Sequence, residues 1–233
     1  KHIIQAIAML RQALNVDKSH EKAREKLLEL YMLIGYGEET LALAQDILAD
    51  DPENIDALRA EAFAYGWRGE FEEALKRSAE IAKVTPEDLQ NQLLALSLLD
   101  RSDAPHAALL EHASDNTGLD PQDARYMLIQ SVAHDLTDDR EGAVEWATKA
   151  AESPPIDVAF VSLLNMQLNR LGQFATSLDL LNRTAEESGD LELKRALVQR
   201  LYEVGDIPGV LEQTDEDMAS LDSTLLAVRA LSL

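Results

Sequence analysis

The sequence contains no cysteine among its 233 residues. This absence excludes disulfides, thiolate nucleophiles and cysteine-ligated metal sites. It fits a reducing or an oxidising compartment equally well, so localisation stays open between the cytoplasm and the periplasm.

Histidines are scarce as well, and the patterns typical of enzymes are missing. His106 and His112 stand six residues apart, which misses the i, i+3 or i+4 spacing that places two ligands on one helical face. We expect both to lie at the surface. The sequence has no glycine-rich phosphate loop and no Gly-x-Ser-x-Gly elbow. We therefore expect no enzyme activity, no metal ion and no cofactor.

Basic residues are outnumbered by acidic ones. Lys and Arg total 21 against 43 Asp and Glu, which gives a formal net charge of −22. Such a surface repels phosphate backbones and anionic membranes, so we expect no nucleic-acid partner. No apolar run approaches the ~20 residues of a transmembrane helix, so we expect no membrane insertion.

Aromatic residues make up only 5% of the chain, and its ten glycines and seven prolines stand at regular positions. The core must therefore consist mostly of Leu, Ala, Ile and Val. Pro52, Pro86, Pro121 and Pro155 are spaced by 34, 35 and 34 residues. A recurring period of this length indicates a solenoid of repeated supersecondary units.

A second set of residues follows the same period. Its six members are Gly35, Gly69, Asp103, Asp138, Gly172 and Gly205. An apolar-periodic segment of about 14 residues, typical of an amphipathic helix, lies before and after each of them. We expect these residues to form the turns inside six helix pairs, with Asp103 and Asp138 in place of glycine.

The segment 55–88 shows the pattern best. Its first helix is expected to present Leu58, Ala62 and Tyr65 on one face, and its second helix Ala74, Ser78 and Ile81. Thr85 is expected to cap the next helix, with Pro86 at its first helical position.

Together with Gly69, Phe71 and Pro86, these residues resemble the tetratricopeptide repeat (TPR) family, and the resemblance covers essentially the whole chain. It implies an all-α, right-handed α-solenoid of antiparallel helix-turn-helix repeats. We expect one array over residues 1–233, with a half repeat at each end, and 89–123 as the irregular unit. Its parts are a half repeat at 1–20, repeats at 21–54, 55–88, 89–123, 124–157, 158–190 and 191–221, and a half repeat at 222–233. Because neither end has a polar cap, we expect the chain to be part of a longer array.

The resemblance also implies a concave groove lined by the second, fifth, ninth, twelfth and thirteenth residues of each repeat. From these places in the middle repeats we select the candidate partner-binding residues. They are Arg59, Phe63, Trp67, Leu93, Arg101, Arg125, Leu128, Met166, Asn169 and Arg170. Arginines would hold carboxylates of an extended peptide or short helix, and apolar pockets would take its side chains. Changing Arg59, Arg125 or Arg170 to Glu should weaken binding and barely alter thermal stability.

Two interpretations of these residues stay open. Phe63 and Trp67 could instead pack between repeats, with the arginines neutralising local acids.

At the level of function, we expect a non-catalytic scaffold for a protein or peptide partner. The alternative is a structural spacer or self-association module of a larger envelope or secretion protein, similar to the periplasmic TPR regions of exopolysaccharide exporters.

Overall fold

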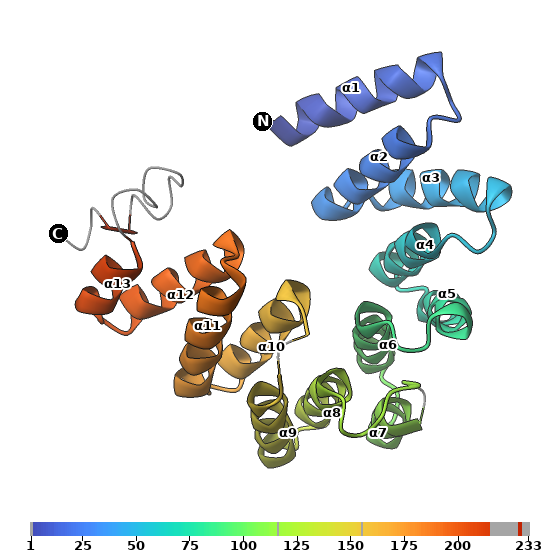
Figure 1. Ribbon diagram of the computed structural model, residues 1–233. Helices are drawn as coiled ribbons and strands as arrows, with labels where there is room; N and C mark the ends of the chain where they lie inside the picture. Colours follow the sequence, from blue (N-terminus) through green and yellow to red (C-terminus); the bar gives the residue numbers. More distant parts are fainter. Residues whose placement is uncertain (1, 116, 155, 215–227, 230–233) are drawn as a thin grey trace. The chain divides into compact units, whose positions relative to one another are not determined.

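A computed structural model describes residues 2–115, 117–154, 156–214 and 228–229 of the chain. Thirteen α-helices and no β-strand lie within these ranges (Figure 1). The predicted half repeat at 222–233 lies outside the described residues except for residues 228 and 229.

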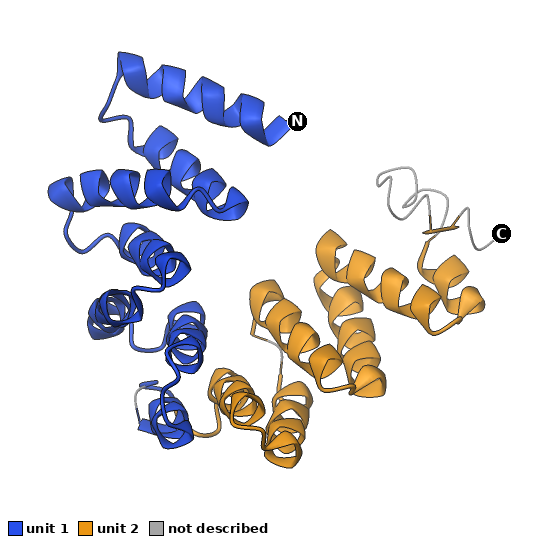
Figure 2. Ribbon diagram, turned by 180° about the vertical axis from the view of Figure 1, so that it is seen from behind, with its two compact units in different colours: residues 1–119 blue, residues 120–233 orange. Residues whose placement is uncertain are grey.

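The helices belong to two compact units, residues 1–119 and residues 120–233 (Figure 2). Unit 1 contains α1 (His2–Val16), α2 (Glu21–Ile34), α3 (Gly37–Asp50), α4 (Ile55–Arg68), α5 (Phe71–Val84), α6 (Leu89–Arg101) and α7 (His106–Asp115). Unit 2 contains α8 (Ala124–Leu136), α9 (Arg140–Glu152), α10 (Val158–Arg170), α11 (Phe174–Ser188), α12 (Leu191–Glu203) and α13 (Ile207–Gln213). Within each unit, every helix packs against the next one in sequence. In addition, α2 packs against α4, α8 against α10, and α9 against α11.

The six periodic turn residues share one backbone conformation. Their φ angles are 72° (Gly35), 78° (Gly69), 55° (Asp103), 62° (Asp138), 75° (Gly172) and 77° (Gly205). In all six turns, the N–H of this residue donates to the carbonyl three residues earlier, and the next N–H donates to the carbonyl five residues earlier. These bonds satisfy carbonyls that the end of a helix leaves without partners. The prediction that Asp103 and Asp138 replace glycine in these turns is confirmed.

Each pair is separated from the next by a turn that ends in a capping side chain. Asn54, Asp88, Asp123, Asp157 and Asp190 each precede a helix and accept a hydrogen bond from a backbone N–H in its first turn. This is the bond that makes Asn and Asp favourable N-caps.

The prediction for Thr85 was wrong. Its hydroxyl donates to the carbonyl of Ile81, and so does its N–H, so Thr85 ends α5 instead of starting α6. Pro86 consequently lies in the connection and not in a helix. The side chain of Asp88 stands directly before α6, where it can reach the N–H of Asn91.

Small side chains bring the helices close together. Ala57, Ala60 and Ala62 of α4 are completely buried. At Gly66, an added Cβ would lie 2.9 Å from Cδ2 of Leu98, so glycine lets this leucine pack directly on α4. In the repeat expected to be irregular, α7 is only 10 residues long, whereas α6 has 13.

Candidate functional site

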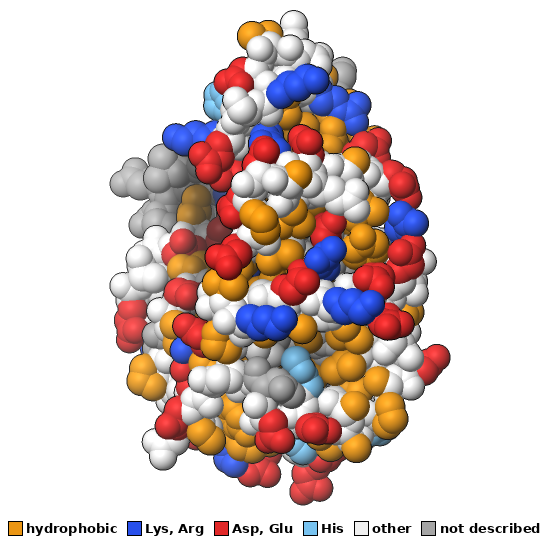
Figure 3. All heavy atoms as spheres, turned by 90° about the vertical axis from the view of Figure 1, so that its right-hand side faces the viewer, with side chains coloured by type: hydrophobic (Ala, Val, Ile, Leu, Met, Phe, Trp, Pro, Cys, Tyr) orange, Lys and Arg blue, Asp and Glu red, His pale blue; other side chains and the backbone are white. Residues whose placement is uncertain are grey.

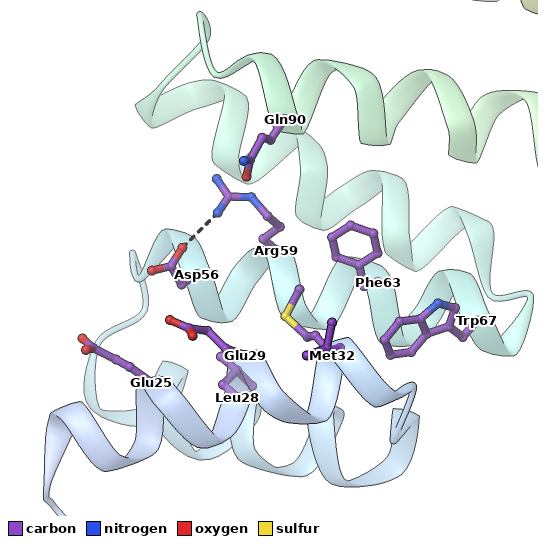
Figure 4. A pocket seen from close by; sticks show the side chains of 10 residues that line it. Glu25, Leu28, Glu29, Met32, Asp56, Arg59, Phe63, Trp67 and Gln90 are labelled. Atoms are coloured by element: carbon purple, nitrogen blue, oxygen red, sulfur yellow. Dashed lines mark hydrogen bonds and ion pairs between the residues drawn. The ribbon is translucent and has the colours of Figure 1, made fainter. Parts of the chain in front are cut away.

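Three of the ten candidate residues lie in a pocket of unit 1 with a volume of about 550 Å³ (Figure 4). Helices α2 and α4 form most of the pocket, and the start of α6 completes it. The lining residues are Glu25, Leu28, Glu29, Met32, Leu33, Asp56, Arg59, Phe63, Trp67 and Gln90. The lining residues recur every three or four residues on α4, and on α2 they follow the i, i+3, i+4, i+7, i+8 pattern, so each set lies on one helical face.

One end of the pocket is apolar. Phe63 and Trp67 lie one turn apart on α4, with ring centroids separated by 6.1 Å, and Met32 of α2 lies near them (Figure 4). Trp67 is 41% exposed and Leu33 is 69% exposed. Two large apolar side chains are thus accessible to a ligand at this end.

The other end of the pocket is charged. Arg59 binds Oδ1 of Asp56 at 2.9 Å and Oδ2 of Asp88 at 2.5 Å, and its side chain is only 16% exposed. Glu29 forms an ion pair with Lys26 on its own helix. Glu25 has no hydrogen bond or ion pair with any described residue. The acids at this end therefore outnumber the single arginine, which is already neutralised.

Arg59, Phe63 and Trp67 are the three candidate residues that line this pocket. Of the other two candidates in unit 1, Leu93 is half-buried on α6. Arg101 donates to the carbonyl of Gly66 at 2.7 Å and lies over the ring of Phe71. Arg101 therefore links the end of α6 to α4 and the start of α5.

The candidates in unit 2 differ in exposure. Leu128 is completely buried, so it offers no surface to a partner and we leave it out of the proposal below. Met166 is 66% exposed. Asn169 accepts a hydrogen bond from Arg200. Arg170 binds Asp135 at 2.8 Å.

Arg125 is also engaged. It binds the carboxylate of Asp123, the residue that caps α8, at 2.7 Å. These hydrogen bonds lower the pKa of Asp123 below its usual value. All four candidate arginines thus contact an acid or a backbone carbonyl of the chain itself.

Seven lining residues of the pocket, among them Leu28, Asp56 and Gln90, were not candidates. The other four of these seven are Glu25, Glu29, Met32 and Leu33. They occupy the fifth, ninth, twelfth and thirteenth places of the repeat at 21–54. The spacing rule applied to the middle repeats would have selected them in this first repeat too.

A second cavity of about 650 Å³ lies between α5, α6 and α7. Among its lining residues are Lys83, His112 and Asp115. His112, expected at the surface, is half-buried. Its Nε2 is buried without a hydrogen-bond partner among the described residues, and burial lowers its pKa. His112 stands three residues after the buried Leu109, so α7 turns both side chains toward the same side.

Surface charge is mixed on the face that Figure 3 shows, where acidic side chains alternate with Lys, Arg and apolar groups. In the described ranges, no group of three or more His, Asp or Glu side chains is placed to hold a metal ion. None of the helices described is long and apolar enough to cross a membrane.

Comparison with known proteins gives matches at the level of structure only. No protein-family model matches the chain, and no curated protein does. A tetratricopeptide repeat protein from Parabacteroides merdae is 14% identical, with a TM-score of 0.51 over 99% of this chain and 92% of the other. A thermophilic TPR protein from Thermus thermophilus is 19% identical, with a TM-score of 0.50 over 78% of this chain and 99% of the other. These structural matches show a shared fold, and they confirm the prediction of an all-α repeat solenoid.

Proposed function

On this tetratricopeptide-repeat fold, we propose a non-catalytic scaffold that binds a segment of a protein partner in the pocket of unit 1. The observation that carries the proposal is the exposure of Trp67 and Leu33 at the apolar end of a pocket of about 550 Å³. A volume between roughly 300 and 1,000 Å³, mainly apolar with a few polar groups, is typical of ligand sites.

Exposed apolar area gives the pocket a driving force for binding. Removing such area from water contributes about 25 cal/mol per Å². Tryptophan is also among the residues that most often dominate binding energy when a partner covers them. Phe63 and Met32 are already partly covered. We therefore expect Trp67 to contact the apolar side chain of the partner, with Phe63 and Met32 supporting that contact.

The role of Arg59 differs from the predicted one. Because Asp56 and Asp88 already bind its guanidinium, Arg59 joins the start of α4 to the residue that caps α6. We therefore expect Arg59→Glu to lower stability as well as binding, contrary to the prediction from sequence. Contact with a partner through Leu93, Arg101, Arg125, Met166, Asn169 or Arg170 stays a prediction.

Selection of peptides from a random display library tests the proposal. Binders should be recovered with the wild-type chain and then measured against Leu33→Glu and Trp67→Ala. Both positions are exposed, so the variants should fold. We expect each change to weaken binding by about tenfold or more, because it removes an apolar contact at the apolar end of the site.

Val84→Glu is the matched control, since Val84 is 51% exposed on α5 and does not line the pocket. It should leave binding unchanged. The proposal fails if no peptide is enriched, or if the enriched peptides bind both pocket variants as tightly as they bind the wild type. The spacer or self-association alternative stays a prediction, which light scattering over a range of chain concentrations tests.

A further inference from the structure

The charges around the unit 1 pocket indicate the chemistry of its partner. We infer that the bound segment is cationic, with Lys or Arg about four residues away from one large apolar side chain. This inference rests on the proposed function, because it describes the occupant of the same pocket. It reverses the prediction that arginines of the groove bind carboxylates of the partner.

Acidic residues outnumber basic ones in the lining of the pocket. Three acids, Glu25, Glu29 and Asp56, line the pocket together with one base, Arg59. That base is 16% exposed and lies between two aspartates, so it has little surface left for an incoming carboxylate. An acidic segment would meet uncompensated like charge, which disfavours binding.

The acids of the lining can be reached by a partner. Glu25 has no partner among the described residues, and the side chain of Asp56 is 74% exposed. The Glu29 side chain is 62% exposed, and its partner Lys26 is 59% exposed. A surface pair of this kind contributes little to stability, so a cation of the partner can replace Lys26. The acidic end can therefore receive a Lys or Arg side chain.

The distance between the acidic and the apolar end of the pocket sets the spacing expected in the partner. Glu25 and Leu33 lie eight residues apart on α2, which corresponds to about 12 Å at 1.5 Å per residue. An extended peptide covers this length in roughly four residues. On α4 the order is the same, with Asp56 toward the acidic end and Trp67 at the apolar end (Figure 4). Both helices thus present acid and apolar surface in the same direction.

Three synthetic peptides test the inference. The first carries Lys-Arg four residues from a single Phe, the second has Glu-Asp in place of Lys-Arg, and the third keeps Lys-Arg directly beside the Phe. We expect the first to bind more tightly than the other two. Binding of the first should weaken roughly three- to tenfold in Glu25→Gln/Glu29→Gln at about 0.01 M salt, and the difference should shrink near 1 M salt.

The control is Glu111→Gln/Asp115→Asn, which changes net charge equally at exposed positions of α7 that do not line the pocket. It should alter affinity less than twofold, about the size of a screened long-range effect. An equal loss in the control would overturn the inference, because the attraction would then come from the chain's overall acidity. Equal or tighter binding of the second or third peptide, still sensitive to Leu33→Glu, overturns the inference and leaves the proposed function intact. If none of the three peptides responds to Leu33→Glu or Trp67→Ala, the inference fails. The proposed function fails as well only if the library-selected peptides are equally insensitive to both changes.

Discussion

At the scale of single residues, Asp103 and Asp138 adopt a backbone conformation that costs an L-residue free energy. Their φ angles of 55° and 62° lie in the left-handed region, where four of the six periodic turns have glycine. Aspartate tolerates this region better than most residues, yet the strain remains.

Replacement of either aspartate by glycine should therefore stabilise the chain. We expect Asp103→Gly and Asp138→Gly each to raise the free energy of unfolding by about 0.5–1 kcal/mol, measured by chemical denaturation. Ser102→Gly is the control, since Ser102 has an ordinary φ of −87° and gains nothing from glycine. Lower stability in both aspartate variants would contradict this explanation of the turns.

A buried ion pair between α4 and α5 gives a second prediction for single residues. Nε of Arg77 lies 2.7 Å from Oε2 of Glu61, and the Glu61 side chain is only 2% exposed. Burial raises the pKa of Glu61, and the positive charge of Arg77 opposes that rise. The pair thus limits the cost of a buried carboxylate.

Arg77→Met should lower the free energy of unfolding by about 2–4 kcal/mol at neutral pH, because it leaves Glu61 charged and unpaired. A raised pKa in the folded state means that this cost is absent below the unfolded value of about 4.3 and grows as the pH rises through the folded pKa. The loss should therefore shrink in acid, and Glu61→Gln/Arg77→Met should lack this pH dependence. An equal loss at every pH would show that Glu61 is not its cause.

The four candidate arginines show why sequence reasoning located the site only in part. Repeat spacing predicts which face of its own helix each of Arg59, Arg101, Arg125 and Arg170 occupies, because that face depends only on position within the helix. Arg59, Arg101 and Arg170 have partners on other turns or helices, which are Asp88, the Gly66 carbonyl and Asp135. Such contacts depend on tertiary structure, so the pattern of one repeat does not reveal them.

At the scale of secondary-structure elements, α7 is the least regular of the second helices in unit 1. It has 10 residues, whereas α3 and α5 have 14 each. Its half-buried His112 shares a cavity with Lys83 and Asp115, and the buried Nε2 has no partner among the described residues. Protonation of His112 would place a charge in this buried position.

We therefore expect α7 to open more readily in acid. Burial lowers the pKa of His112 in the folded state, so the unfolded chain binds the proton first. Stability from this residue is fully present above the unfolded pKa of about 6.5 and falls as the pH drops through that value.

Hydrogen exchange of the α7 amides, compared on the two sides of that pH, measures this opening. His112→Phe should abolish the pH-dependent part of the exchange, whereas His106→Gln, at an exposed position of the same helix, should retain it. If the two variants behave alike, His112 does not control the stability of α7.

The starts of the first helices of the repeats were largely predictable at this scale, although the cap of α6 is Asp88 and not Thr85. Helices α2, α4, α6, α8, α10 and α12 begin at the residues with which the six expected repeats begin. The reason is local: a capping side chain precedes each start and an apolar period follows it. The shortening of α7 lies within the repeat that the sequence marked as irregular, but its extent depends on packing that the period does not encode.

At the scale of the whole molecule, the fold was predictable because, within each of the two units, neighbouring helices account for most contacts. The pocket combines residues from two repeats, 21–54 and 55–88, together with Gln90 of the next one. Position within the repeat identifies such residues, as the places of Glu25 and Leu33 show. The charge available to a partner depends on which ion pairs form between helices. The sequence does not show these pairs, whereas the structure does.

Fluorescence of Trp67 tests whether the unit 1 pocket receives an apolar side chain of a protein segment. The chain has two tryptophans, so Trp146→Phe leaves Trp67 as the only indole reporter. Titration with the peptide that carries Lys-Arg four residues from Phe should shift the emission of Trp67 to shorter wavelengths and saturate, because the peptide removes water from the ring. Binding detected by calorimetry without any change in that emission would contradict the account.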